Sequence, residues 1–406
     1  MKRPEILAPA GDMERLMAAV QFGADAVYLA AKSFGMRTSP GNFDDEQLRS
    51  AVALCHAAGV RVYLACNILP HDADMERLPA AMEIWQDAGV DALIMADIGV
   101  MEMAKRHAPR CDMHISTQTG VVNAYAARAL HDMGASRVVL ARELSLEEIT
   151  ALRAKVPAEL ELECFVHGAM CMGISGRCML SAYLTGRDAN QGDCTQPCRW
   201  KYGLTEQNRP GYVYTVEEYP DGTYLFNAND LNMLRHIAPL AYAGVSSFKI
   251  EGRAKAAYYT AVTANAYRCA AEGFELAGFP RDWTPEAWME MELNKISHRP
   301  YGTGFYFGQP SQNTKEGGYI REYKVAAVVE GYENGRLLLS QRNRFFCGDM
   351  MDVLSPGKPP VMLCADDLRD ESGEAVDVAP HPMMRFSIAC DVQIEKGSIL
   401  RVLCVH

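Results

Sequence analysis

The sequence lacks any uninterrupted apolar run long enough to cross a membrane, although 49% of its 406 residues are hydrophobic. Its first residues, MKRPEILAPAGDM, reach a proline and acidic residues before any long apolar run, so we expect no signal peptide. It also lacks a G-x-G-x-x-G motif after the first expected strand, and the H-E-x-x-H and G-x-S-x-G motifs of common hydrolases. These absences predict a cytoplasmic protein with no membrane partner and no dinucleotide site of that type.

Positive net charge is missing as well. The formal net charge is −11 and the pI is about 5.5, so the whole surface should repel nucleic acid at long range unless a local basic patch overcomes this average. Cysteine, in contrast, is abundant, with 13 residues. Because disulfides do not persist in the cytoplasm, this number favours thiols and metal ligands.

Four of the cysteines gather in one glycine-rich stretch between Glu163 and Tyr202. They are Cys171, Cys178, Cys194 and Cys198, spaced C-x6-C-x15-C-x3-C. Four thiolates complete either a tetrahedral zinc site or a 4Fe–4S cluster. Since only the last two lie as close as the paired ligands of structural zinc sites, the spacing favours iron–sulfur, with zinc as the alternative. The third interpretation is four reduced thiols in a core.

A repeated pattern runs through the first part of the chain: a helix ends at a glycine and a short apolar strand follows. The glycines are Gly23, Gly59, Gly89, Gly134 and Gly244. A glycine can take the left-handed conformation that ends a helix, and such strands are apolar enough to be buried on both faces. With the strands that lack this glycine, eight are expected, at residues 5–8, 26–30, 60–66, 92–96, 113–117, 137–141, 160–166 and 246–250.

Eight strands that alternate with helices predict an α/β protein with a TIM-type (β/α)8 barrel, and an open doubly wound sheet is the alternative. We expect the barrel to span residues 1–275, with the Cys-rich insertion at 168–245 after the seventh strand and a helix at 230–242 leading into the eighth. A proline-rich linker or cover should follow at 276–320. Alternating β patterns and the Asn334-Gly335 turn then predict a small β-barrel domain at 321–406.

In such a barrel the ends of the strands carry the chemistry. Period-2 alternation in the eighth strand places Lys249, Glu251 and Arg253 on one side, where they could receive an anion or form ion pairs that seal the barrel. Glu163 and His167 on the seventh strand complete the predicted catalytic group. Other strand-end candidates are Asn67, Asp97 and His114.

Three further residues are predicted to bind substrate. Arg37 follows the second strand and Arg142 the sixth, where each could contact an anion. Tyr28 on the second strand could stack on a base, because unpaired nucleotides are recognised by stacking. For each, a purely structural place in the core or on the surface is the alternative.

The Cys-rich stretch also resembles the signature of the collagenase-like peptidases of unassigned catalytic type, known as peptidase family U. The resemblance rests on the pattern Glu163-x-Phe165-x-x-Gly168-Ala169-Met170-Cys171-x4-Gly176-x-Cys178-x-Leu180-Ser181. The pieces APAGD, GADAVYLA, NFDDEQL, NQGDCTQPCRW, FKIEGRAKAAYY and HRPYGTGFY resemble the same family. Together they cover most of the barrel and its cover.

This resemblance implies a function that the family name does not describe. Members of the family are linked to oxygen-independent hydroxylation of a tRNA wobble uridine (the TrhP-like branch), of a ribosomal RNA cytidine, or of a quinone precursor. The family further implies a 4Fe–4S cluster on the four cysteines, and its RNA-modifying branch implies prephenate, a small-molecule carboxylate, as co-substrate. Since the quinone branch is essentially a barrel alone, the additional β-domain favours tRNA hydroxylation. A metal-containing peptidase is the alternative, and the sequence does not predict an oligomeric state.

Overall fold

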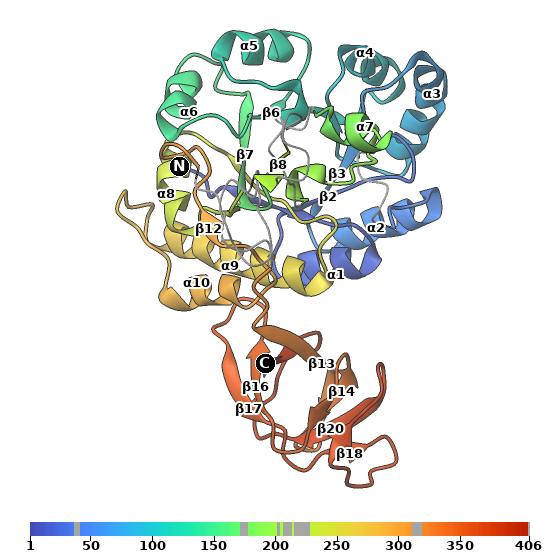
Figure 1. Ribbon diagram of the computed structural model, residues 1–406, viewed down its shortest axis with the longest axis vertical. Helices are drawn as coiled ribbons and strands as arrows, with labels where there is room; N and C mark the ends of the chain where they lie inside the picture. Colours follow the sequence, from blue (N-terminus) through green and yellow to red (C-terminus); the bar gives the residue numbers. More distant parts are fainter. Residues whose placement is uncertain are drawn as a thin grey trace.

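The computed structural model describes residues 1–35, 41–170, 178–200, 204–205, 213–214, 228–310 and 319–404. Eight parallel strands close into a barrel, because the last of them pairs with both the first and the seventh (Figure 1). They are β1 (Glu5–Pro9), β2 (Ala26–Leu29), β3 (Arg61–Cys66), β4 (Ala92–Met95), β5 (Asp112–Ile115), β6 (Arg137–Val139), β7 (Glu161–Gly168) and β11 (Ser247–Ile250). The predicted TIM-type barrel is confirmed.

Helices surround this barrel in the usual alternation (Figure 1). They are α1 (Met13–Gln21), α2 (Asp45–Ala57), α3 (Asp72–Asp87), α4 (Ile98–His107), α5 (Ala124–Asp132), α6 (Leu146–Arg153), α8 (Ile237–Tyr242) and α9 (Ala257–Leu276). The five glycines that precede strands have positive φ angles, from 72° to 102°, as their pattern predicted. Ser145 and Glu148 form a reciprocal capping box at the start of α6. Within the described residues, no helix combines the length and hydropathy needed to cross a bilayer.

The insertion after β7 contains short elements. These are α7 (Leu180–Thr185), the 3-10 turns η2 (Ala189–Gln191) and η3 (Pro197–Arg199), and the antiparallel pair β8 (Leu204–Thr205) and β9 (Val213–Tyr214). The chain then returns through β10 (Asp230–Asn232) and the turn η4 (Leu234–His236) to α8. The expected helix at 230–242 was therefore wrong over its first half. Residues 230–232 instead pair with the end of β7, which extends beyond the other strands and offers free backbone groups.

The segment after α9 lies beside the barrel. Its helix α10 (Ala287–Asn294) packs against α9, and β12 (Tyr301–Gly302) pairs with β10 in parallel. The hydroxyl of Tyr306 donates to the carbonyl oxygen of Phe165 on β7, 2.7 Å away. These contacts fix the segment to the insertion's return strand and to β7.

A separate antiparallel sheet forms the C-terminal domain, at the opposite end of the molecule from α5 (Figure 1). Its order is β17 (Val361–Cys364), β16 (Met350–Leu354), β21 (Ile399–Leu403), β13 (Tyr323–Glu333), β14 (Arg336–Gln341), β20 (Arg385–Ala389) and β18 (Arg369–Asp370). A small pair, β15 (Phe345–Phe346) with β19 (Val378–Ala379), accompanies it. Asn334 and Gly335 take positive φ in the predicted hairpin turn between β13 and β14.

Three buried charged residues and the partly buried Lys295 join this domain to α10. Arg401 on β21 donates to both oxygens of Glu292 on α10, at 2.7 and 3.1 Å, and also pairs with Asp352 on β16. Lys295, just after α10, pairs with Glu292 at 2.7 Å and with Asp352. We call Glu292, Lys295, Asp352 and Arg401 the interface cluster. Its two acids and two bases balance, which allows the charges to be buried.

Candidate functional site

Charged side chains also fill the lower half of the barrel, near the N-terminal ends of the strands. Arg137 on β6 donates to Glu5 on β1 at 2.6 Å and to Glu163 on β7 at 3.1 Å. The hydroxyl of Ser247 on β11 donates to the same two carboxylates, at 2.8 and 3.3 Å. Burial opposes ionisation of Glu5, but Arg137 and Arg61 outweigh it and hold the pKa of this carboxyl below its usual value. Paired charges thus occupy part of the barrel interior near the N-terminal ends of these strands.

Lys249 belongs to the same group. Its ammonium lies 2.8 Å from Glu163 Oε1 and over the ring of Tyr28, 4.7 Å from the ring centre. The side chain is only 6% exposed. We call Glu5, Arg137, Glu163 and Lys249 the barrel cluster. Because its charges satisfy one another, the geometry favours a sealing ion pair for Lys249 and Glu163, and places both below the mouth of the barrel.

Two other predicted residues lie at the mouth itself. Arg142, which follows β6, donates to the carbonyl oxygen of Ala169 at 2.8 Å and lies 3.7 Å from Glu251. Its guanidinium also stacks on the ring of Phe165, 3.7 Å from the ring centre. Glu251 directly follows β11, so the structure brings these two predictions together at the C-terminal end of the barrel. Arg253 is buried nearby, where its carbonyl oxygen closely approaches Gly11.

His167 lies at the end of β7 among aromatic rings. The centres of the Tyr259, Tyr267 and Tyr301 rings are 5.4 to 5.9 Å from its own. Burial, with His298 and Lys255 adding to it, lowers the pKa of His167 to about 3, so the imidazole is neutral at physiological pH. Its Nε2 atom has no hydrogen-bond partner among the described residues. These properties suit a hydrogen-bonding group better than a proton carrier.

Gly168 ends β7 and directs the chain into the Cys-rich insertion. Its φ angle is +105°, and a Cβ atom built there would lie 2.3 Å from the carbonyl oxygen of Glu251. A side chain at this position would therefore need both a strained backbone and a separation of β7 from the end of β11. The course of the insertion depends on this close approach.

The four cysteines are described only in part, since Cys171 lies outside the described residues. Cys178 and Cys194 carry free thiols, and each sulfur accepts a backbone N–H bond at 3.4 Å, from Leu180 and Gln196 respectively. Hydrogen bonds of this kind are found around thiolate ligands of iron–sulfur clusters. Among the described residues alone, no three His, Cys, Asp or Glu side chains are grouped for a metal. The four-cysteine site stays a prediction.

The insertion is held against the C-terminal end of β3. Leu69, after β3, donates its N–H to the carbonyl oxygen of Asn190 at 3.3 Å, and the side chain of Gln191 donates to the carbonyl oxygen of Leu69. The Asn190 side chain in turn accepts the N–H of Cys178 at 3.2 Å. Cys178 is thereby fixed near the face where barrel enzymes have their active sites.

The remaining predicted residues, where the structure describes them, make contacts within the barrel or cap a helix. Tyr28 is buried and its hydroxyl donates to the carbonyl oxygen of Ile250 at 3.0 Å, and Arg37 lies outside the described residues. Asp97 caps α4, and the Asn67 side chain bonds that of Gln118. His114 lies inside the barrel, with its ring 4.6 Å from that of Tyr63.

Sequence reasoning missed Arg137 and the interface cluster. A signal existed for Arg137, which begins an otherwise apolar strand, and for Arg401, which interrupts the apolar strand Ile399–Leu403. A charge within a buried strand needs a partner, but its partner comes from a distant part of the chain.

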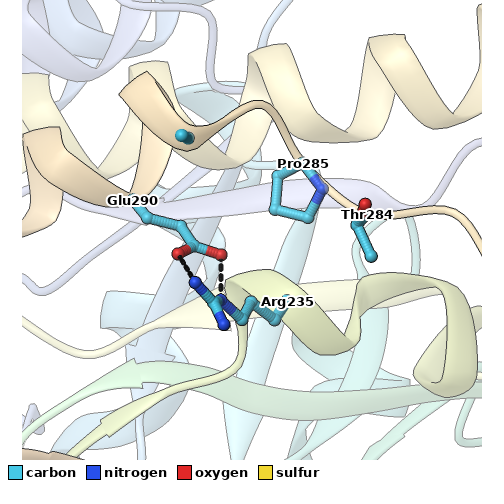
Figure 2. Close-up of a pocket in the computed structure, with 5 residues that line it drawn as sticks. Arg235, Thr284, Pro285 and Glu290 are labelled. Atoms are coloured by element: carbon cyan, nitrogen blue, oxygen red, sulfur yellow. Dashed lines mark hydrogen bonds and ion pairs between the residues drawn. The ribbon is translucent and has the colours of Figure 1, made fainter.

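A surface pocket of about 280 Å³ lies beside α10. Figure 2 shows Arg235 and Glu290 facing each other across it, joined by an ion pair. Thr284, Pro285 and Ala287 line the rest. Because the charges neutralise each other at an exposed position, this pocket offers no chemistry comparable with the barrel mouth.

Comparison with known proteins agrees with this architecture. The chain matches Peptidase family U32 over residues 11–316 and the Peptidase family U32 C-terminal domain over residues 321–401. It is 34% identical to tRNA hydroxylation protein P1 of Bacillus subtilis, covering 98% of this chain and 95% of that one.

Two relatives have other names. The 23S rRNA 5-hydroxycytidine C2501 synthase of Escherichia coli is 36% identical over 62% of this chain and 37% of its own length. A collagenase of Porphyromonas gingivalis is 32% identical over 75% of this chain and 74% of its own length. With both of its domains matched, the chain belongs to peptidase family U32.

Proposed function

We propose that this protein hydroxylates an RNA base without molecular oxygen, and that its product is 5-hydroxyuridine at the wobble position of tRNA. The observation that carries the proposal is the similarity to a tRNA hydroxylation protein over 98% of this chain and 95% of that one. It includes the C-terminal domain, which a barrel-only relative acting on a quinone precursor would not need. This role would place the protein in the cytoplasm.

Cys171, Cys178, Cys194 and Cys198 are proposed to hold a 4Fe–4S cluster. The donor set supports this, since it consists of thiolates, and the backbone N–H groups aimed at Cys178 and Cys194 stabilise negative charge on sulfur. When bound, such a cluster supplies electron transfer. Zinc is the alternative occupant of the same residues.

Arg142 is the proposed partner of a small-molecule carboxylate, with prephenate as the proposed co-substrate. Among the described residues its guanidinium makes one hydrogen bond and one long ion pair, so most of its five N–H donors are left for a ligand. A planar guanidinium with two donors in parallel matches a carboxylate. Its stacking on Phe165 fixes that plane at the mouth of the barrel.

The function is tested by mass spectrometry of tRNA from a strain that lacks this gene and any paralogue. We expect 5-hydroxyuridine and the nucleosides derived from it to disappear, and to return when the wild-type gene is restored. A Cys178→Ser gene should fail to restore them, whereas the Cys364→Ser control in the C-terminal domain should succeed. Unchanged 5-hydroxyuridine would overturn the proposal, and loss of 5-hydroxycytidine from ribosomal RNA instead would redirect it to the alternative RNA.

The cofactor is tested on protein purified without oxygen. A visible absorbance band with about four iron and four sulfide per chain is expected. Stoichiometric zinc without iron would overturn the iron–sulfur assignment and support the zinc alternative.

A peptidase is the second candidate, favoured by the name of the family and of the collagenase relative. The buried thiols do not support it, because burial raises the pKa of Cys66 and of Cys164 to about 12 and keeps both protonated. Anaerobically purified protein should leave a collagen-like peptide library intact. Cleavage that the Cys178→Ser variant abolishes would support the peptidase.

A further inference from the structure

Three cationic side chains meet at the ring of Tyr319. The ammonium of Lys255 lies 4.1 Å from the centre of this ring, and the guanidinium carbons of Arg299 and Arg321 lie 5.0 and 6.0 Å from it. We call Lys255, Arg299 and Arg321 the cation cluster. Contacts of this length between a cation and a ring are attractive, so the ring holds together charges that repel one another.

Hydrogen bonds fix the segments that carry these charges. His298 and Ile320, the residues just before the two arginines, exchange two backbone hydrogen bonds, at 2.8 and 3.2 Å. The carbonyl oxygen of Ser297 accepts a hydrogen bond from Lys255 Nζ at 3.3 Å, and its hydroxyl accepts one from Arg321 Nε at 3.1 Å. The cation cluster is therefore built into the fold and does not depend on a chance meeting of long side chains.

Positive charge is in excess where these side chains meet. Arg299 is only 4% exposed, and its ion pair with Asp230 is long, at 3.9 Å. Arg321 is exposed and makes no ion pair with any described residue. Three cations and the one carboxylate of Asp230 leave a charge of +2 for these four side chains. A buried cation with like charges beside it and a distant carboxylate is stabilised when an anion binds.

The cation cluster lies between the barrel mouth and the C-terminal domain. Lys255 is in the loop after β11, and the loops after strands form the face where barrel enzymes act. Its ammonium lies 5.4 Å from the centre of the Tyr259 ring, and that centre is 5.9 Å from the His167 ring at the end of β7. Arg321 comes just before β13, the first strand of the C-terminal domain. A ligand that reaches from the mouth to this domain would pass the cluster.

We infer that the cation cluster binds backbone phosphates of the RNA substrate, next to the nucleotide that enters the barrel. This inference rests on the proposed function and adds the path of the strand from the mouth to the C-terminal domain. Phosphates repeat along the strand, so neighbouring ones can engage more than one cation. Because the chain has a net charge of −11, RNA binding requires a local positive site of this kind. Phosphate contacts position a strand without reading its sequence.

The test measures binding of a fluorescently labelled tRNA anticodon stem–loop to the anaerobically purified protein by anisotropy, at several KCl concentrations. Arg321→Gln and Lys255→Gln each keep a hydrogen-bond donor for Ser297 but remove one charge. Each should raise Kd about 5- to 8-fold at about 0.1 M salt, and should lower the slope of log Kd against log salt concentration by about 0.7–0.9, the value for one phosphate contact. A stem–loop with a changed loop sequence should show the same loss.

Two control variants accompany these measurements. Arg321→Lys keeps the charge and should keep the wild-type slope. Arg110→Gln removes the same charge from an arginine that is 68% exposed. Arg110 lies in the loop between α4 and β5, on the face of the barrel opposite the mouth, so this variant should change neither Kd nor the slope.

The outcomes separate failure of the inference from failure of the proposed function. If the wild type binds the stem–loop and both glutamine variants keep its Kd and slope, the inference fails while the proposed function stands. An equal change of slope in Arg110→Gln would assign the effect to net charge and overturn the inference. If the glutamine variants bind RNA normally but bind prephenate more weakly in calorimetry, the cluster holds the small carboxylate and the inference is overturned. If the wild type binds no RNA, both fail.

Discussion

The barrel cluster and the interface cluster both pair two carboxylates with two cations, in different parts of the molecule. Each has two carboxylates and two cations, so each buries charge without leaving a net excess. The barrel cluster joins strands that are neighbours in one sheet, whereas the interface cluster joins a helix of the first domain to two strands of the second. The first fixes the inside of a domain, and the second fixes one domain to another.

Removing the shared carboxylate of the barrel cluster should have the largest effect. Glu163→Gln takes from Lys249 its carboxylate partner and from Arg137 one of its partners, and breaking a buried pair costs about 3–5 kcal/mol of unfolding free energy. Urea denaturation followed by circular dichroism measures this loss. Glu161→Gln is the control, because Glu161 pairs with the same arginine but is 45% exposed, so its loss should cost less than about 1 kcal/mol. Equal losses of unfolding free energy in the two variants would show that the stability contributed by the barrel cluster does not depend on burial.

Substitution in the interface cluster should cost less unfolding free energy, and it should also change the number of unfolding transitions. Arg401→Met leaves Glu292 and Asp352 without their arginine, but the domains can separate slightly and admit water, so we expect a loss of about 2–3 kcal/mol. Calorimetry should then show two transitions where the wild type shows one. Arg385→Met, which removes an arginine that is 74% exposed, should leave the single transition unchanged. A single transition in Arg401→Met would contradict the assigned role.

Lowering the pH should distinguish the two regions by a smaller change in the free energy of unfolding. His114 lies inside the barrel, and burial together with Arg137 and Lys249 holds its pKa well below the usual value. A lowered pKa in the folded state means that stability is complete above about pH 6.5 and is lost as the pH falls below it. His114→Gln should therefore make the decline between pH 6.5 and 5 shallower by up to about 1.4 kcal/mol per pH unit, measured by urea denaturation. Arg401→Met leaves His114 and the neighbouring Arg137 and Lys249 in place, so this variant should keep the wild-type slope.

Much of the fold was predictable from the sequence because it depends on local rules. The glycines before strands, the capping box at Ser145 and the Asn334-Gly335 turn each act within a few residues, and all three were confirmed. The β10 strand was not predictable in the same way. Its residues pair with β7, more than sixty positions earlier, and no local pattern indicates that partner.

The candidate site shows the same limit. Alternation placed Lys249 and Glu251 on one side of their strand, but their partners differ: Glu163 below the mouth for the lysine, and Arg142 at the mouth for the glutamate. Alternation gives the side of a strand on which a residue lies, not its depth in a barrel. That depth depends on the stagger between β7 and β11, which only the paired structure defines.

Gly168 also bears on how this family could diversify. Only the hydrogen atom of a glycine fits between position 168 and the carbonyl oxygen of Glu251. The chain therefore leaves β7 in one direction, and the insertion begins from that point. Segments of different length and content could then be exchanged downstream without rebuilding the scaffold. The glycine keeps the exit point of the chain constant, and the segment that follows it can change in sequence and chemistry.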